Sequence, residues 1–105
     1  MQQFEIYLAN LDPNQGAEIK KTRPVIIVSP NEMNNHLKTV IVAPITSQLH
    51  QNIPTRIKII LQDTVSYIVL EQLRTLDKNR LYKFIDNASK NVHNNIKNTL
   101  IEMFT

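Results

Sequence analysis

The sequence contains no cysteine, and glycine occurs only once among its 105 residues. Without cysteine, disulfides, thiolate metal sites and a cysteine nucleophile are all excluded. No apolar run approaches the ~20 residues of a membrane-spanning helix, and the first residues lack the charged start and long apolar stretch of a signal peptide. We therefore expect a cytoplasmic protein that does not associate with membranes.

Several common catalytic motifs are also missing. The sequence has no phosphate-binding loop, no dinucleotide fingerprint and no nucleophile elbow. The three histidines are scattered, and no His, Asp or Glu pair at i, i+4 spacing comes with a third partner, so we predict no metal and no cofactor. His93 is expected on the surface. His50 lies close to Thr46 and is a candidate acid or base, although loop histidines are more often simply solvated.

Length and charge set the broad class. A chain of this size is expected to form one domain, residues 1–105, with enough apolar surface for one core. Its formal net charge is +3, and its cations cluster: three fall in 20–23 and four in 74–83. If folding brings these two stretches together, they form the basic face expected of a protein that binds a phosphate backbone.

The segment 20–29 changes abruptly from cations to an apolar block at 25–28. Pro24 separates the two, and because proline lacks an N–H we expect it at an edge or at the first position of a strand. The block behind it is apolar at every position, which predicts a strand buried on both faces. Arg23 then stands extended at the mouth of that strand, where it is better placed to bind an anion than on a mobile loop. A solvated charge at a strand end is the alternative.

The remaining pattern predicts a mainly β chain of the α+β class. Loop 12–22 holds Gly16, needed for positive φ or for a close approach. Ser89 is the expected N-cap of a C-terminal amphipathic helix, and Asp77 that of a short turn at 77–81. We predict further strands at 4–9, 39–43 (ended by Pro44), 55–61, 66–70 and 82–85, and a helical turn or irregular segment at 30–37. These elements describe a small, strongly bent sheet or barrel capped by a helix.

A candidate site emerges if strands 25–28 and 39–43 are neighbours. Arg23 and Thr46 then stand at proline-delimited ends of adjacent strands and can converge. Arginine together with hydroxyls suits a phosphate, because guanidinium is planar, always charged and bidentate. Glu18, Ser47 and Arg74 complete the candidate set. Simple capping of strand ends by the two hydroxyls is the alternative.

A longer series of motifs runs along the chain: Leu11-Asp12-Pro13, Gly16, Glu18, Arg23-Pro24, Asn34, segments 40–47 and 71–77, Arg80 and the closing helix. In this order and spacing they resemble the MazF/PemK/Kid group of toxins from bacterial toxin–antitoxin pairs, over roughly residues 5–104. The sequence departs from the family at Phe4, which stands where a glycine usually precedes the acidic residue.

The resemblance implies an SH3-like barrel of about five to seven short strands that forms a homodimer. It also implies a sequence-specific, ribosome-independent and metal-independent endoribonuclease that cuts single-stranded mRNA, leaving a cyclic phosphate and a 5′-hydroxyl, and that a cognate antitoxin inhibits. The family's catalytic arginine and threonine fall on Arg23 and Thr46. We predict possible catalytic or positioning roles for Glu18, Ser47 and Arg74, and RNA contacts at Gly16, Lys20, Lys21, Gln72, Arg74 and Asp77.

Elementary chemistry agrees with this in outline. Attack by the RNA's own 2′-hydroxyl needs a proton acceptor, charge stabilisation at phosphorus and a proton for the leaving 5′-oxygen. Arg23 suits charge stabilisation, and Glu18 is our candidate acceptor because a guanidinium rarely deprotonates. Two alternatives stay open: a CcdB-like toxin that binds DNA gyrase without chemistry of its own, and a basic barrel that binds RNA passively.

Overall fold

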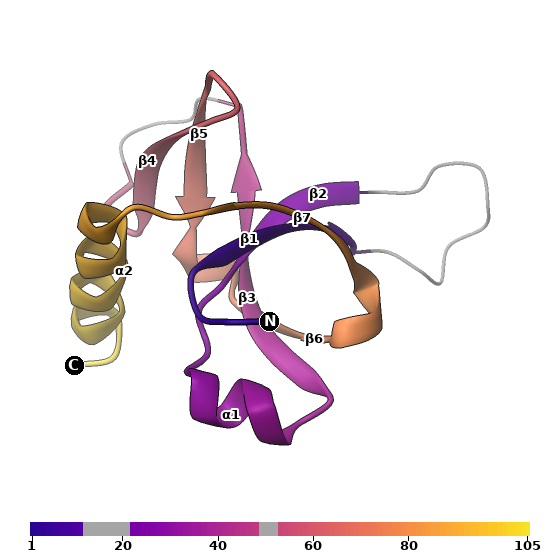
Figure 1. Ribbon diagram of the computed structural model, residues 1–105. Helices are drawn as coiled ribbons and strands as arrows, with labels where there is room; N and C mark the ends of the chain where they lie inside the picture. The colour runs from indigo at the N-terminus through magenta and orange to yellow at the C-terminus, as the bar shows by residue number, and fades with distance from the viewer. Residues whose placement is uncertain (12–21, 49–52) are drawn as a thin grey trace.

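The structure of the protein, a computed structural model, describes residues 1–11, 22–48 and 53–105 (Figure 1). A curved antiparallel sheet dominates these ranges, and two single 3₁₀ turns, η1 (Leu70–Gln72) and η2 (Lys78–Arg80), flank one of its strands. The strands are β1 (Glu5–Asn10), β2 (Thr22–Ile27), β3 (Thr39–Thr46), β4 (Arg56–Leu61), β5 (Thr64–Val69), β6 (Arg74–Asp77) and β7 (Leu81–Asn87), and the helices are α1 (Asn31–His36) and α2 (Lys90–Met103).

The sheet is organised around β3. Its strand order is β4-β5-β3-β2-β1-β7, with β6 paired to β3 off this path. Along its length β3 pairs with β6 at 39–42, with β2 at 42–44 and with β5 at 45–46. The β4–β5 pair therefore leaves the main sheet as a separate ribbon (Figure 1), and α2 packs against β4 and η1. This is the predicted α+β arrangement, a bent sheet with a helix over one end.

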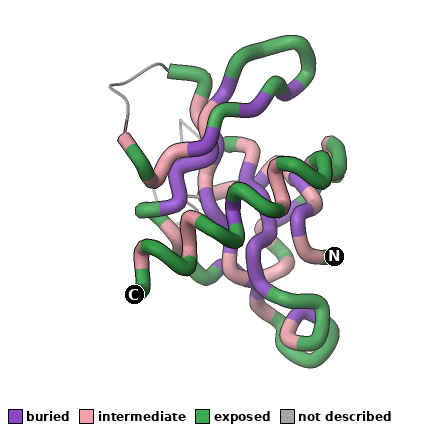
Figure 2. Tube along the Cα trace, turned by 90° about the vertical axis from the view of Figure 1, so that its left-hand side faces the viewer, coloured by how far each residue is buried: buried purple, intermediate pink, exposed green. Residues whose placement is uncertain are grey.

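The sheet is buried on both faces at its centre. Side chains of β2 alternate between two core clusters, with Ile26 in one and Val25 and Ile27 in the other. All three are 0% exposed, so the predicted burial of both faces of this strand is confirmed. Figure 2 shows the buried segments running through the middle of the trace, with exposed chain at the helices and the ribbon tip.

Pro24 and Pro44 both lie inside strands, so the prediction that they mark strand ends is wrong, but the alternative expectation of an edge position holds for Pro24. β1 pairs with β2 over 22–26, but β3 pairs with β2 only from Val25 onward, so β2 has a partner on one side alone at Pro24. At Pro44 the β6 pairing has ended at Val42 and the β5 pairing has not begun. A proline there removes no ladder hydrogen bond on that side.

The predicted helices agree with the structure more closely than the predicted strand boundaries do. The Ser89 side chain accepts a hydrogen bond from the Val92 N–H at the start of α2, as expected of an N-cap. Asp77 precedes η2 but makes no capping hydrogen bond through its side chain, which corrects that prediction. Strand β6 is missing from the prediction, because only Leu76 of its four residues is buried. No helix in the described ranges is long and apolar enough to cross a membrane.

Helix α1 is fixed by a buried amide. Asn34 is 1% exposed; its Oδ1 accepts from the Ser29 hydroxyl at 2.5 Å and its Nδ2 donates to the Ser29 carbonyl at 2.9 Å. The same hydroxyl accepts from the Ile41 N–H at 3.0 Å, which joins α1 to β3. The Lys78 ammonium donates a hydrogen bond to the backbone carbonyl of Asn34. One cation of the basic stretch 74–83 is therefore engaged within the fold.

Phe4 occupies a conformation that usually belongs to glycine. Its φ is 72°, in the left-handed region, at the position where the resemblance anticipates a glycine. Its N–H donates to the Ile27 carbonyl and its own carbonyl accepts from the Ala88 N–H, so the local backbone is fixed at both ends. The ring is 5% exposed and stacks on His93 with centroids 4.3 Å apart. His93 is therefore half-buried against Phe4, and its expected place on the open surface is corrected.

The backbone of Phe4 gives a testable order of stabilities. Phe4→Ala should lower the free energy of unfolding by about 3–5 kcal/mol, because a buried ring is lost. Phe4→Gly loses the same ring but relieves the left-handed backbone, so it should be more stable than Phe4→Ala by about 1 kcal/mol. Urea unfolding measures both variants.

The control is Asn94, an exposed residue of α2, where the order should reverse and glycine should be less stable than alanine by roughly 0.5–1 kcal/mol. If glycine is also the less stable residue at position 4, the strain assigned to Phe4 is absent.

Candidate functional site

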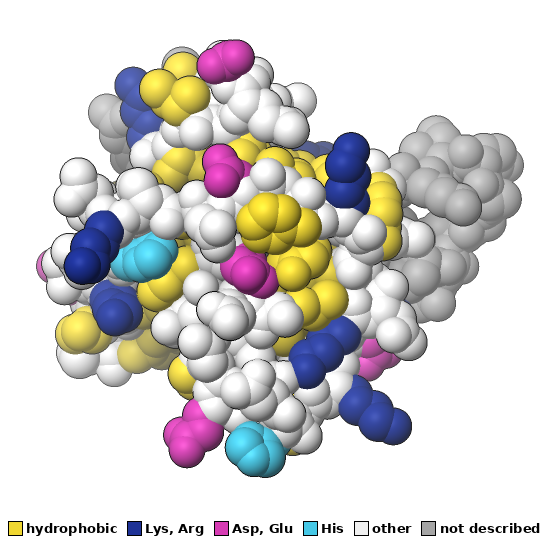
Figure 3. All heavy atoms as spheres, viewed as in Figure 1, with side chains coloured by type: hydrophobic (Ala, Val, Ile, Leu, Met, Phe, Trp, Pro, Cys, Tyr) yellow, Lys and Arg dark blue, Asp and Glu magenta, His cyan; other side chains and the backbone are white. Residues whose placement is uncertain are grey.

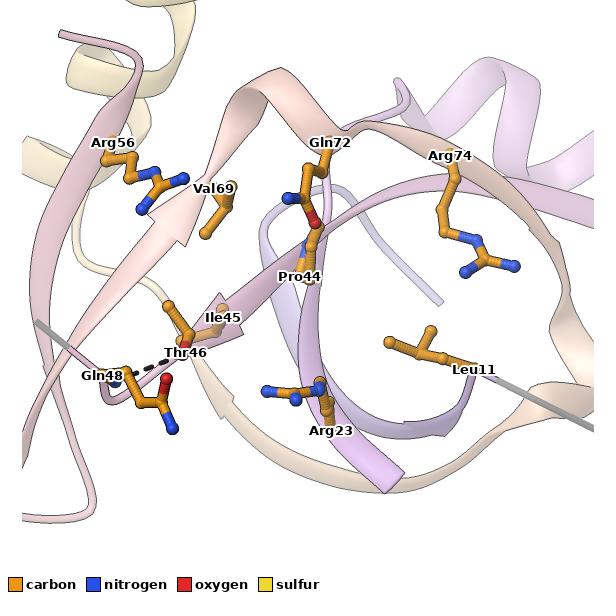
Figure 4. A pocket seen from close by; sticks show the side chains of 10 residues that line it. All are labelled: Leu11, Arg23, Pro44, Ile45, Thr46, Gln48, Arg56, Val69, Gln72 and Arg74. Atoms are coloured by element: carbon orange, nitrogen blue, oxygen red, sulfur yellow. Dashed lines mark hydrogen bonds between the residues drawn. The ribbon is translucent and has the colours of Figure 1, made fainter. Parts of the chain in front are cut away.

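A pocket of about 290 Å³ opens where β2, β3 and the β5–β6 connection meet (Figure 4). Strand ends and short connections supply its walls, as expected for a site built on a rigid sheet. Its polar lining consists of Arg23, Thr46, Gln48, Arg56, Gln72 and Arg74, and its apolar lining of Leu11, Pro44, Ile45 and Val69.

The β2–β3 pairing brings Arg23 and Thr46 to the same pocket. Val25 pairs with Pro44, and continuing this antiparallel register by two residues leads to Arg23 on one strand and Thr46 on the other. Residues two apart on a strand share a face, so both side chains project to the side on which Pro44 lines the pocket. In Figure 4 the Arg23 guanidinium extends toward Thr46 and Gln48. The two strands anticipated as neighbours are neighbours.

The opposite wall comes from the segment after β5. The turn η1 carries Gln72, and β6 begins at Arg74, which pairs with Val42 of β3. Figure 4 shows Gln72 across the pocket from Arg23, with Pro44 between them. Arg74 lies further along the same wall, with its guanidinium on the side of Leu11. Because β3 pairs with both β5 and β6, the short connection between these strands is held over the pocket.

Arg56 is a site residue that sequence reasoning missed, since its strand alternation suggested only an exposed face. Its Nε and Nη2 both donate to Glu71 Oε2, at 3.0 and 2.7 Å, and Thr55 Oγ1 donates to Glu71 Oε1 at 2.7 Å. Only 17% of the Arg56 side chain and 32% of the Glu71 side chain are exposed. The carboxylate therefore holds the guanidinium at the pocket wall. No local sequence signal points to this pair, because Arg56 and Glu71 belong to different elements and meet only in the folded chain.

The same contacts shift the acidity of Glu71. Burial alone raises its pKa, but the hydrogen bonds from Arg56 and Thr55 outweigh burial and lower the pKa below its ordinary value of 4.5. At neutral pH the group is a carboxylate engaged by a cation, which makes it a poor proton acceptor for chemistry in the pocket.

The Thr46 hydroxyl makes one local contact. Its Oγ1 accepts a hydrogen bond from the Gln48 N–H at 3.2 Å, the strand-end capping weighed as the simple alternative. A hydroxyl that accepts still has its own hydrogen to donate. Capping and ligand binding are therefore compatible at Thr46, because the backbone contact fixes the oxygen and leaves the hydrogen for a partner in the pocket.

Two predicted site residues lie elsewhere. Ser47 is exposed and absent from the pocket lining, because side chains alternate along extended chain and Thr46 already faces the pocket. Asp77 pairs with Thr39, at the opposite end of β3 from Thr46, and lines a different pocket with Lys78. Arg23, Thr46, Gln72 and Arg74 are brought together as predicted. Gly16, Glu18, Lys20, Lys21 and His50 lie outside the described residues.

The arrangement suits a phosphodiester. Three guanidinium groups line the pocket, and its described lining contains no carboxylate, so the local charge favours an anion. Arginine pairs with phosphate oxygens in a bidentate manner, and the neutral donors Thr46 and Gln72 supply further hydrogen bonds. Among the described residues, no three His, Asp or Glu side chains gather as metal ligands.

Comparison with known families decides the assignment. A family model described as PemK-like, MazF-like toxin of type II toxin–antitoxin system matches residues 2–104. The chain belongs to this family. It is 42% identical to a protein named Endoribonuclease MazF from Staphylococcus saprophyticus, over 91% of this chain and 88% of the relative.

Solved structures of MazF proteins share its fold. The Mycobacterium tuberculosis toxin MazF-mt6 has a TM-score of 0.80 and 22% identity, over 95% of each chain. An endoribonuclease in complex with its cognate antitoxin, from Mycobacterial species, has a TM-score of 0.83 and 22% identity, over 99% of this chain and 94% of that one. MazF from Deinococcus radiodurans has a TM-score of 0.80 and 19% identity, over 99% and 96%. The predicted barrel-like fold of the MazF/PemK family is thereby confirmed.

The Arg56–Glu71 pair predicts a pH-dependent loss of stability. Folding lowers the pKa of Glu71, so its carboxylate stabilises the fold above the unfolded-state pKa near 4.5, and this stabilisation is lost as pH falls through the lower folded-state pKa. Glu71→Gln should therefore lower the free energy of unfolding at pH 7, by under about 1 kcal/mol because the pair is partly exposed. The difference in the free energy of unfolding between Glu71→Gln and the wild type should shrink below pH 4.5.

Urea unfolding at a series of pH values measures this difference. Glu102→Gln is the matched control, since Glu102 is exposed on α2. A difference for Glu71→Gln that stays constant or grows on acidification would contradict the stabilising pair.

Proposed function

We propose that this chain is a sequence-specific, ribosome-independent endoribonuclease that cuts single-stranded mRNA as the toxin of a type II toxin–antitoxin pair. The observation that carries the proposal is the convergence of Arg23, Arg74 and Thr46 on one pocket. A relative that is 42% identical is named an endoribonuclease, and the family model describes toxins. The family also favours this function over the binding of DNA gyrase by a CcdB-like toxin.

The proposed reaction uses the substrate's own nucleophile. The 2′-hydroxyl attacks the adjacent phosphorus, the bond from phosphorus to the 5′-oxygen breaks, and the products carry a 2′,3′-cyclic phosphate and a 5′-hydroxyl. The attacking hydroxyl gives its proton to an acceptor, and the leaving oxygen takes one up. Because RNA supplies the nucleophile, neither a protein nucleophile nor a metal-bound water is required.

The described residues of the pocket have different roles in the proposed reaction. Arg23 and Arg74 both line the pocket, and they stabilise the negative charge that grows on the phosphate oxygens in the transition state. Thr46 donates its hydroxyl hydrogen to a phosphate oxygen and holds the group in line for attack. Gln72 contacts the RNA beside it. Arg56, ion-paired with Glu71, forms part of the pocket wall and stays in place without substrate.

Glu18 remains our candidate for the proton acceptor. An arginine is a poor choice for this step because a guanidinium rarely gives up its proton in a protein. Glu71 is a poor choice because Arg56 and Thr55 engage it and lower its pKa. We propose that the segment with Gly16, Glu18, Lys20 and Lys21 contacts the RNA, and His50 is a second candidate for proton transfer.

We also propose that residues 1–105 act as one domain, in a cytoplasmic homodimer that a cognate antitoxin inhibits. Two solved relatives are described as complexes, an endoribonuclease with its cognate antitoxin and MazE-MazF from Deinococcus radiodurans. On this chain Tyr82 and Phe84 of β7 are 56% and 46% exposed, and Figure 3 shows apolar side chains gathered over β1 and β7. Exposed aromatic side chains are typical of surfaces that bind protein.

The first test is RNA cleavage in excess EDTA. Purified protein should cut a long unstructured RNA at one recurring short sequence and leave 5′-hydroxyl ends. Arg23→Ala should lower the cleavage rate by about 10²–10³-fold, the usual effect of removing a group that stabilises transition-state charge. Lys90→Ala, which removes an exposed cation from α2, should cleave like the wild type.

If the folded protein leaves the RNA intact, this result contradicts the nuclease proposal for that substrate. If Arg23→Ala cuts at the wild-type rate, Arg23 has no catalytic role.

Thr46 offers a second test that separates its hydroxyl from its shape. Thr46→Val keeps the β-branched strand residue but removes the hydrogen that contacts the phosphate, and should lower kcat by about 10²-fold or more. Thr46→Ser keeps the hydroxyl and should retain most of the activity. Single-turnover cleavage of the mapped target sequence measures both, and equal losses in the two variants would assign Thr46 to packing alone.

A further inference from the structure

The strand register sets a tyrosine and a lysine in line with Thr46. Thr46 of β3 pairs with Tyr67 of β5, and Tyr67 pairs with Lys58 of β4. Directly paired residues of antiparallel strands project to the same face, with Cβ atoms about 4.5–5.5 Å apart. The preceding row, Ile45, Ile68 and Ile57, is buried in the core and marks the opposite face.

This row continues a face that the pocket already uses. Arg56 pairs with Val69, and both line the pocket. Lys58 and Tyr67 are the next pair along the same face of the β4–β5 ribbon, just beyond the pocket lining. We call the face formed by these two pairs the ribbon track.

Packing in the hydrophobic core does not account for an aromatic side chain at position 67. Its neighbours Ser66, Ile68 and Val69 are buried, whereas Tyr67 is half-buried and belongs to neither core cluster. Lys58, beside it, is exposed. The fold thus leaves an aromatic ring and an ammonium group side by side on an accessible face that begins at the pocket.

We propose that the ribbon track binds the nucleotide next to the cleaved phosphodiester, with Tyr67 stacked on its base and Lys58 on its phosphate. The inference rests on the proposed function, because it takes the pocket as the site of the reacting phosphate. Single-stranded RNA is bound by aromatic rings that stack on bases and by cations along the backbone, and the ribbon track supplies both.

The spacing and charge of Arg56 and Lys58 fit an extended RNA strand. Arg56 and Lys58 are two residues apart on β4, a rise of about 6.7 Å, which is comparable to one step of an extended polynucleotide. Arg56 is held in place by Glu71, so a strand leaving the pocket meets one fixed cation and then Lys58. Stacking on Tyr67 is tolerant of base identity, so the ribbon track adds affinity more than sequence choice.

Binding can be measured without cleavage. The probe is a fluorescein-labelled, unstructured 2′-O-methyl RNA of mixed sequence, which lacks the attacking hydroxyl, and the readout is fluorescence anisotropy. Tyr67→Ala should weaken binding by about five- to a hundredfold, the usual loss for one stacked base. Tyr67→Leu, which keeps apolar bulk and guards against misfolding, should behave like Tyr67→Ala, and Tyr67→Phe should bind like the wild type.

Lys58→Gln should bind more weakly and lower the slope of log affinity against log salt by about 0.7, because one phosphate is no longer neutralised. The matched controls are Phe104→Ala at the end of α2 and Lys90→Gln on α2, both of which remove exposed side chains away from the ribbon track. Both should leave affinity and salt slope unchanged.

Cleavage supplies a second readout. Once the target sequence is mapped, synthetic RNAs shortened by single nucleotides from either end should reveal one end at which trimming raises the wild-type KM. Tyr67→Ala should already show the raised KM with kcat retained, and should be indifferent to trimming at that end.

The outcomes separate the two proposals. If Tyr67→Ala and Tyr67→Leu bind the 2′-O-methyl RNA like the wild type, the ribbon track is overturned, whether or not the wild type cuts RNA. If binding depends on Tyr67 while the wild type cuts no RNA, the ribbon track stands and the nuclease proposal fails. Folded wild-type protein that does not bind the probe overturns the ribbon track, and cleavage of RNA in EDTA then decides the nuclease proposal by itself.

Discussion

The successive pairing of β3 with three strands is the constraint on which the rest of the structure depends. Its first half pairs with β6, its middle with β2 and its last two residues with β5. This single strand therefore places Arg23 beside Thr46 and holds Gln72 and Arg74 over them. The two prolines lie at positions where one side of a strand has no partner, so the sheet can divide there without losing ladder hydrogen bonds.

The three arginines that line the pocket differ in their ion pairing. Three guanidinium groups in a small volume repel one another, and one of them, Arg56, is neutralised by Glu71 at 2.7 Å. Among the described residues neither Arg23 nor Arg74 has an ion-pair partner, so under the proposed function their charge is available to an anion. The fold thus fixes one guanidinium as part of the pocket wall and leaves the other two to a ligand.

Much of this architecture could be predicted, because the information is local. Uninterrupted apolar runs indicate the strands buried on both faces, and the spacing of Val92 and Ile96 after Ser89 indicates α2. Arg23 and Thr46 could be identified from their places near strand ends. The Arg56–Glu71 pair could not, since it joins residues of β4 and η1 that meet only after the ribbon has formed. The left-handed backbone of Phe4 is likewise set by Ile27 and Ala88, far away in the sequence.

The alternation of β4 has a consequence for how such a chain can diverge. Ile57, Ile59 and Leu61 face the core, while Lys58 and Ile60 face outward, so the two sets of side chains meet different demands. Substitutions on the outward set leave core packing untouched. Outward-facing substitutions on the ribbon are therefore less destabilising than substitutions in β3. Over evolutionary time a lineage can change how tightly it holds its substrate at the ribbon while the strands that form the pocket stay the same.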